Sequence, residues 1–212
     1  MEAEFWHERW KDNNIGFHEG KPNSLLVKHL GQLGLKKGAR VFVPLCGKTC
    51  DLGWFMEQGF EVVGVELSKT AVEQLFEELG LRPRLKSDGP LVRYSAEGIE
   101  ILQGNLFEVS SELIGTVDAH YDRAALVALP PTLRDNYALH VAKITDSAPQ
   151  LLICFDYEQK VMDGPPFSVD EAEVRRLYGT SYDLNLLERA EVAGGLKGKC
   201  PAAEDVWILR QK

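Results

Sequence analysis

Short, nearly continuous apolar runs alternate with helical segments over most of this chain of 212 residues. An apolar run without polar alternation is typical of a strand buried on both faces, and such strands, separated by helices, form a parallel sheet covered on both sides. Strands are predicted at residues 40–44, 60–66, 99–103, 117–122 and 150–155. Helices are predicted at 51–58 and 131–145, after the cap Ser68, and after a capping box at 168–171. The pattern therefore predicts a doubly wound α/β fold with a mostly parallel sheet.

Further elements are predicted at both ends of this alternating pattern. A helix is expected from Glu4 to Asn13, and Pro22-Asn23-Ser24 opens a second helix before the first strand. Residues 182–188 and 205–210 are strand candidates that predict a closing hairpin.

Residues 81–98 contain prolines, glycines and mixed charge, so a loop or insertion is expected there. No convincing linker divides the chain. We therefore expect a single domain, with residues 1–35 as an N-terminal lid and residues 36–212 as a Rossmann-like core.

The composition narrows the class of partner. The chain carries 32 acidic and 24 basic residues, a formal net charge of −8, which argues against binding to nucleic acid or to an anionic membrane. No apolar stretch reaches the length of a membrane span, and the acidic, aromatic N-terminus does not resemble a signal peptide. We expect a soluble cytoplasmic monomer that acts on a small molecule, because no long apolar stripe is left over for an interface.

The turn after the first predicted strand contains Gly47, nineteen residues before Glu66 at the end of the next strand. In open parallel sheets a ligand binds at the carboxyl ends of the strands, and a carboxylate about 20 residues after a glycine turn can accept hydrogen bonds from ribose hydroxyls. Gly47 lets the backbone approach such a ligand closely. The spacing predicts a site for a nucleoside-like molecule.

The glycine turn does not match the dinucleotide or triphosphate motifs. Only Gly47 and Gly53 stand where a dinucleotide fold has three glycines, which favours S-adenosylmethionine over NAD because a nucleoside without phosphates needs less from the turn. Gly47-Lys48-Thr49 resembles the end of a P-loop, but Phe42 occupies the position of that motif's first glycine. We expect Lys48 to be a solvated loop residue.

Metal binding is not expected. The four cysteines have no CxxC spacing, and the five histidines show no ligand-like spacing, so no zinc site is predicted. Cys46 lies beside the glycine turn, and we expect it to be a small buried packing residue.

Several longer motifs resemble the thiopurine S-methyltransferase family, in the right order and over nearly the whole chain. Two of them are distinctive, namely Val43-Pro-Leu-Cys-Gly-Lys48 and Tyr121-Asp-Arg-Ala-Ala-Leu-Val-Ala128. The others are Phe5-Trp-His-Glu-Arg-Trp10, Gly16-Phe-His18, Trp54-Phe55, Val62-Val-Gly-Val-Glu66 and Asp163-Gly-Pro-Pro-Phe167. The resemblance implies a class I S-adenosylmethionine-dependent methyltransferase fold with an N-terminal helical lid. It also implies methyl transfer to the sulfur of thiopurines or related thiols, or to selenium and tellurium compounds.

The resemblance also assigns roles to individual residues. Trp10 would cover the cofactor from the lid, Leu45 and Gly47 would touch it from the turn, and Glu66 would hold its ribose. The remaining roles fall on Asn105 near the adenine, on Arg123 close to both cofactor and acceptor, and on Phe17 in the acceptor pocket.

Each of these residues also has a structural interpretation. Trp10 and Phe17 would also suit core positions of an amphipathic segment, and Asn105 would suit a turn. Asp122 would orient Arg123, accept a proton, or form a purely structural pair with it.

One departure from the family concerns the acceptor. The family carries a second arginine in the loop before the last strand, whereas this loop reads Gly194-Gly-Leu-Lys-Gly-Lys-Cys200. Lys197 or Lys199 would be the substitute, although lysine lacks the planar fork of arginine. The identity of the acceptor is therefore left open.

Two other functional classes are kept as alternatives. One is a dehydrogenase with a degenerate nucleotide turn, and the other is a non-catalytic protein that binds a nucleoside-like ligand on the same fold. For the methyltransferase, a dedicated base is not required, because a thiol is appreciably ionised near neutrality and the thiolate is the nucleophile. Arg123 would then be the catalytic residue, favouring the anionic acceptor.

Overall fold

The computed structural model describes residues 3–16 and 18–212. They form two compact units, Met1–Ala119 and His120–Lys212, and each unit is described by itself. Within the described residues, no helix combines the length and the apolar character needed to cross a membrane.

The first unit is built on five strands in the order β3-β4-β5-β2-β1. They are β1 (Arg40–Val43), β2 (Glu61–Glu66), β3 (Arg84–Asp88), β4 (Leu91–Ala96) and β5 (Ile99–Gln103). Strands β1, β2 and β5 are parallel, and β4 and β3 continue the sheet in antiparallel pairs. Apolar residues on both faces of the parallel strands are buried, as the continuous apolar runs predicted.

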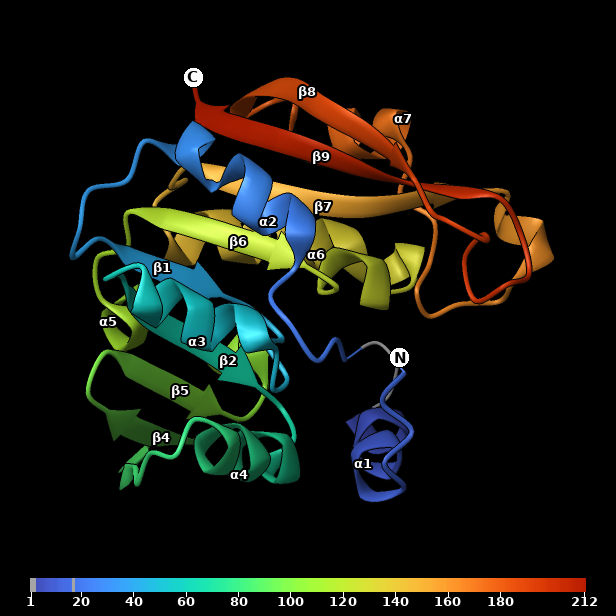
Figure 1. Ribbon diagram of the computed structural model, residues 1–212. Helices are drawn as coiled ribbons and strands as arrows, with labels where there is room; N and C mark the ends of the chain where they lie inside the picture. The colour runs from blue at the N-terminus through green and yellow to red at the C-terminus, as the bar shows by residue number, and fades with distance from the viewer. Residues whose placement is uncertain (1–2, 17) are drawn as a thin grey trace. The chain divides into compact units, whose positions relative to one another are not determined.

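Helices connect the parallel strands of this unit. Figure 1 shows α3 and α4 lying in front of β2 and β5, on one face of the sheet. The helices are α1 (Ala3–Lys11), α2 (Ser24–His29), α3 (Cys50–Glu57), α4 (Lys69–Glu78) and the short α5 (Ser111–Ile114), with 3₁₀ turns η1 (Leu30–Leu33) and η2 (Leu106–Glu108). Ser68 caps α4 as predicted, with its hydroxyl accepting from the Ala71 amide.

An ion-pair network closes the amino ends of the parallel strands. Arg40 at the start of β1 pairs with Glu61 at the start of β2 and with Glu100 in β5, and Glu100 also pairs with Arg93. The Arg40 and Arg93 side chains further donate to the Ile114 and Leu113 carbonyls. This end of the sheet is therefore occupied by structural contacts, which leaves the carboxyl ends for a ligand.

The second unit has four strands in the order β6-β7-β9-β8. They are β6 (Ala119–Arg123), β7 (Gln150–Tyr157), β8 (Tyr182–Glu191) and β9 (Ala202–Gln211). Strands β6 and β7 are parallel, whereas β9 and β8 extend the sheet in antiparallel pairs. The helices are α6 (Pro131–Ile144) and α7 (Glu171–Tyr178), with 3₁₀ turns η3 (Leu126–Ala128) and η4 (Gln159–Val161).

Two expectations about local structure are wrong. Residues 81–98 are not a loop, because β3 and β4 form a hairpin there. Strand β3 is mostly exposed and polar, so it lacks the apolar run that marks a buried strand. Asp170, not Ser168, caps α7, because the Ser168 hydroxyl accepts from the Tyr157 amide instead. The predicted closing hairpin is confirmed, because β8 and β9 form an antiparallel pair, although both strands are longer than predicted.

Candidate active site

The turn between β1 and α3 has an unusual backbone. Leu45 has φ +45° and Gly47 has φ +53°, both in the left-handed region. For a residue with a side chain this conformation costs about 1–2 kcal/mol, and it persists mainly where the surroundings hold it. The Cys46 amide donates to the Val65 carbonyl at 3.0 Å, which fastens the turn to β2.

Glu66, the last residue of β2, faces this turn. Its Oε2 accepts from the Gly47 amide at 2.9 Å and its Oε1 from the Ser68 amide at 2.6 Å. The residue is buried but keeps 6% of its surface exposed. A carboxylate can accept about four hydrogen bonds, so acceptor capacity remains for a ligand hydroxyl.

Burial raises the pKa of two side chains at this end of the sheet, Glu66 and Cys46. It raises the pKa of Glu66, and the hydrogen bonds from the amides of Ser68, Gly47 and Leu67 oppose that rise. Burial, and after it the nearby Glu66 carboxylate, raises the pKa of Cys46 well above its ordinary value. Cys46 is therefore a neutral thiol at physiological pH, in agreement with a packing residue.

The end of β5 bonds to the backbone at the end of β2. The Gly104 amide donates to the Glu66 carbonyl at 2.9 Å, and Gln103 Nε2 donates to the Leu67 carbonyl at 2.9 Å. Asn105 follows, is exposed, and accepts from the Phe107 amide at 3.1 Å, so it caps the η2 turn. Its predicted place near an adenine stays a prediction.

Helix α1 brings Trp10 to the glycine turn. Trp10 is buried, with 4% of its surface exposed. A Cβ placed on Gly47 would lie 3.1 Å from Trp10 Cζ2, which is closer than an ordinary van der Waals contact. The structure thus brings Trp10, Gly47 and Glu66 together, with Leu45 in the same turn. The predicted acceptor residue Phe17 lies outside the described residues.

Lys48 is not the solvated loop residue that we expected. Its Nζ lies 2.5 Å from Glu78 Oε1 near the end of α4, and its side chain is only 12% exposed. The solvated assignment is wrong because Glu78, the last residue of α4, pairs with the lysine, a contact that the local sequence does not show.

The second unit contains the other predicted site residue, Arg123, which is half-buried at the end of β6. The preceding Asp122 is fully buried, and its Oδ2 accepts from the Tyr137 hydroxyl at 2.7 Å, while Oδ1 accepts from the Leu126 amide at 3.1 Å. Burial raises the pKa of Asp122 to about 6, against the opposing effect of these hydrogen bonds. Tyr137 was not predicted, because a tyrosine 15 residues away inside a helix carries no motif signal.

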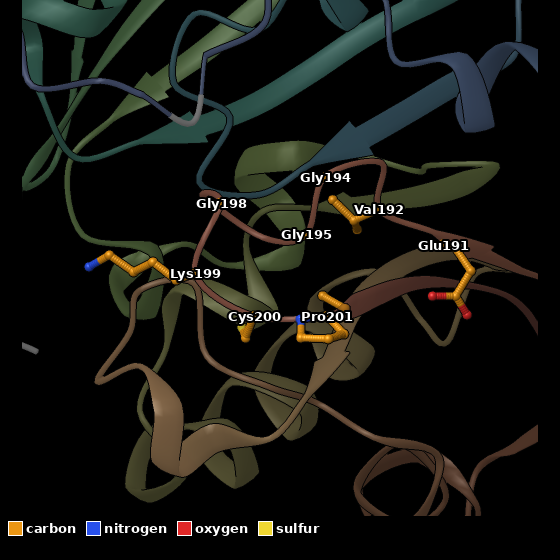
Figure 2. A pocket seen from close by; sticks show the side chains of 9 residues that line it. Glu191, Val192, Gly194, Gly195, Gly198, Lys199, Cys200 and Pro201 are labelled. Atoms are coloured by element: carbon orange, nitrogen blue, oxygen red, sulfur yellow. The ribbon is translucent and has the colours of Figure 1, made fainter.

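The two candidate lysines, Lys197 and Lys199, lie in the loop between β8 and β9 and have different surroundings. Lys197 Nζ donates to the Pro165 carbonyl at 2.8 Å, so it ties this loop to the Gly-Pro-Pro segment. Lys199 lines an open pocket with Gly195, Cys200 and Pro201. Figure 2 shows the Lys199 side chain extending away from Cys200 and Pro201. Neither lysine is shown to replace an arginine, and that substitution stays a prediction.

The family and its members match this chain over almost its full length. The family model described as thiopurine S-methyltransferase matches residues 1–211. A thiopurine S-methyltransferase from Xanthobacter autotrophicus is 53% identical over 212 residues, covering all of both chains. One from Gluconobacter oxydans is 50% identical over 205 residues, covering 97% of this chain and 93% of its own.

Solved structures that resemble this one are methyltransferases. The 1,6-didemethyltoxoflavin-N1-methyltransferase of Burkholderia thailandensis has a TM-score of 0.65 at 16% identity and covers 99% of this chain and 87% of its own. A TehB-like SAM-dependent methyltransferase of Corynebacterium glutamicum has a TM-score of 0.59 at 12% identity and covers 99% and 98%. At this identity the likeness concerns the fold, and it confirms the predicted class I methyltransferase fold. The chain belongs to the thiopurine S-methyltransferase family, and it is an S-methyltransferase with S-adenosylmethionine as its methyl donor, as its motifs predicted.

Proposed function

We propose that this enzyme methylates the sulfur of a thiopurine or a related thiol, or a selenium or tellurium compound, with Glu66 as the anchor of the methyl donor. The observation that carries the proposal is the Glu66 carboxylate, which backbone amides hold in place at the carboxyl ends of β1 and β2. It is the group whose chemistry fits ribose hydroxyls, because it is an acceptor with capacity left over. The residues of the first unit therefore fit S-adenosylmethionine.

We assign the donor-binding roles as follows. Glu66 accepts hydrogen bonds from the ribose, Leu45 and Gly47 line the turn beside it, and Trp10 covers this turn from α1. Asn105 takes the place near the adenine, in the segment whose Gly104 amide bonds to the Glu66 carbonyl.

The chemistry asks little of the protein beyond alignment. S-adenosylmethionine supplies, when bound, a methyl group that a sulfonium already activates. Transfer forms a bond between acceptor sulfur and methyl carbon, breaks the sulfonium–methyl bond, and releases S-adenosylhomocysteine. The thiol proton goes to water, since the thiolate is the nucleophile. Arg123 favours the anionic acceptor by its charge.

The family membership separates this proposal from the two alternatives. Hydride transfer to NAD is disfavoured, because the chain belongs to a family of S-methyltransferases. A binder without turnover is disfavoured on the same ground, and it differs from the proposal only in the acceptor step. The experiments below therefore measure donor binding and methyl transfer separately.

Donor binding is tested by isothermal calorimetry with S-adenosylhomocysteine. We expect micromolar affinity for the wild type and a loss of about 1–3 kcal/mol, roughly tenfold or more, for Glu66→Ala, because a charge-assisted hydrogen bond is removed. Glu61→Ala is the matched control, since Glu61 begins the same strand at its opposite end and pairs there with Arg40. An affinity that Glu66→Ala leaves unchanged overturns the ribose assignment.

Methyl transfer is tested by mass spectrometry of the products with a panel of a thiopurine, simple thiols, and soluble selenium and tellurium compounds. A methylated product that forms in step with S-adenosylhomocysteine supports the proposal. Folded protein that binds S-adenosylhomocysteine but methylates no member of the panel supports the non-catalytic binder. Hydride exchange with NADH would support the dehydrogenase.

The remaining expectations belong to the same proposal. We propose a single-domain monomer that acts in the cytoplasm on a small molecule, without nucleic-acid or membrane partners. Light scattering coupled to size-exclusion chromatography tests the oligomeric state, and cell fractionation tests the location. A dimer in solution overturns the first of these, and a secreted or membrane-associated protein the second.

A further inference from the structure

We propose that the buried hydrogen bond between Asp122 and Tyr137 positions the turn that carries Arg123 and so controls the acceptor step of methyl transfer. The inference rests on the proposed function, because it acts on the group assigned to the acceptor. It assigns the two residues a positioning role, and they do not touch the reacting atoms.

The turn after β6 needs such support. Ala124 directly follows Arg123 and has φ +65°, a left-handed conformation that costs a residue with a side chain about 1–2 kcal/mol. Ala125 and Leu126 then begin a tight 3₁₀ segment, in which the amides of Ala128 and Leu129 donate to the Ala125 and Leu126 carbonyls. A strained turn of this kind persists only where neighbouring groups over-determine it.

Asp122 supplies that constraint from inside the protein. One carboxylate oxygen accepts from the Leu126 amide at 3.1 Å and the other from the Tyr137 hydroxyl at 2.7 Å. Asp122 and Tyr137 have no exposed surface. Water cannot readily take over either hydrogen bond, so losing one partner leaves the other polar group buried and unsatisfied.

Helix α6 is the rigid element to which the turn is tied. Tyr137 lies near the middle of this helix of 14 residues, and Arg134 one turn earlier donates through Nε to the Leu129 carbonyl at 3.1 Å. The middle of the turn is held by the Phe167 amide, which donates to the Val127 carbonyl at 2.6 Å. The turn is therefore held from the helix at both ends and from the Gly-Pro-Pro loop in the middle.

The same geometry argues against Asp122 as a general base. A group with no exposed surface cannot receive a proton from an acceptor in solution or in an open site without a rearrangement. Its hydrogen bonds run to a helix and to backbone amides, which are fixed parts of the fold. Of the roles considered for Asp122, the structure therefore favours positioning.

The test compares two substitutions that each remove one buried tyrosine hydroxyl. Tyr137→Phe deletes the partner of Asp122. Tyr178→Phe is the matched control, because Tyr178 on α7 is also buried and its hydroxyl, within the described chain, does not bond to Asp122. For each variant we would measure the free energy of unfolding, the affinity for S-adenosylhomocysteine, and kcat and KM for the acceptor, taken as the member of the thiopurine, thiol, selenium and tellurium panel that the wild type methylates.

We expect Tyr137→Phe to bind S-adenosylhomocysteine within about twofold of the wild type and to lose about tenfold in kcat/KM for the acceptor. Tyr178→Phe should stay within about twofold in both quantities. In an Arg123→Ala background, Tyr137→Phe should cause no further loss in kcat/KM, because its effect passes through the arginine. A purely structural hydroxyl would lower stability without this dependence on Arg123.

Several outcomes overturn the inference. If the wild type methylates its acceptor but Tyr137→Phe and Tyr178→Phe behave alike, the positioning role is wrong while the proposed function stands. Losses from Tyr137→Phe and Arg123→Ala that add in full also contradict it. If the wild type transfers no methyl group, the proposed function itself fails. Should Tyr137→Phe not fold, Asp122→Asn gives the same comparison, since it keeps the side-chain shape but weakens the acceptor.

Discussion

Two buried carboxylates stand at the ends of central strands, Glu66 as the last residue of β2 and Asp122 as the last but one of β6. Burial raises the pKa of both, and hydrogen bonds to each oppose that rise. The two carboxylates differ in their hydrogen-bond partners and in how much of their surface is exposed. Glu66 is held by backbone amides and keeps 6% of its surface exposed, whereas Asp122 also bonds to the Tyr137 side chain and has none.

The difference shows that burial and a perturbed pKa do not by themselves identify a ligand-binding residue. Both groups would satisfy that criterion. What separates them is whether a ligand can reach the carboxylate and whether the donors around it belong to the local turn or to a distant helix. By these measures Glu66 is suited to bind a ligand and Asp122 to hold the fold around Arg123.

The largest expected effect on stability is that of Asp122→Ala. At pH 5 we expect it to lower the free energy of unfolding by about 3 kcal/mol, because the Tyr137 hydroxyl and the Leu126 amide lose their acceptor inside the core. Glu66→Ala should cost about half as much, because its amides lie in turns at the edge of the site. Urea unfolding of both variants measures the difference, and a larger loss for Glu66→Ala would break the comparison.

A smaller effect is expected in the pH dependence of stability. The pKa of Asp122 rises from its ordinary 3.8 to about 6 on folding, so between these values the folded protein holds a proton that the unfolded chain has released. Stability from this group therefore falls as pH rises through that window, by about 2 kcal/mol between pH 4.5 and 7.

Asp122→Asn removes this titration and is the variant to compare with the wild type. The Tyr137, Tyr178 and Cys154 side chains on α6, α7 and β7 surround the carboxylate and stay neutral over this range, since burial raises their pKa values. The difference in unfolding free energy between the two proteins should change across the window. A constant difference would show that Asp122 does not titrate there.

The smallest expected effect on stability compares the turn after β1, which contains Gly47, with the turn after β6, which contains Ala124. Gly47→Ala should lower the unfolding free energy by about 1 kcal/mol, because it places a Cβ at a positive φ and against Trp10. Ala124→Gly is the reciprocal change and should be nearly neutral, since relief of strain offsets the added freedom of the unfolded chain. Thermal unfolding measures both. Equal losses for the two variants would contradict the view that each turn is strained at these residues.

Much of the fold follows from local pattern. Strand β2 and helix α4 lie where apolar runs and the Ser68 cap predicted them, because a buried strand and a capped helix leave a signal within a few residues. The β3–β4 hairpin was missed, because the exposed edge strand β3 consists mostly of polar residues, as loops do. The assignment of Ser168 as a cap failed because Tyr157, eleven residues away, takes its hydroxyl.

The candidate site also has features that the sequence predicted and features that only the structure shows. The sequence by itself determined the family, the α/β fold and the position of Gly47 and Glu66 after neighbouring parallel strands, because these depend on motifs and on a spacing that parallel strands impose. The tertiary structure alone decided that Lys48 pairs with Glu78, that Lys197 bonds to Pro165, and that Asp122 bonds to Tyr137. Each of these contacts joins residues from different elements. Their formation depends on burial and on the packing of one element against another, which no local stretch of sequence encodes.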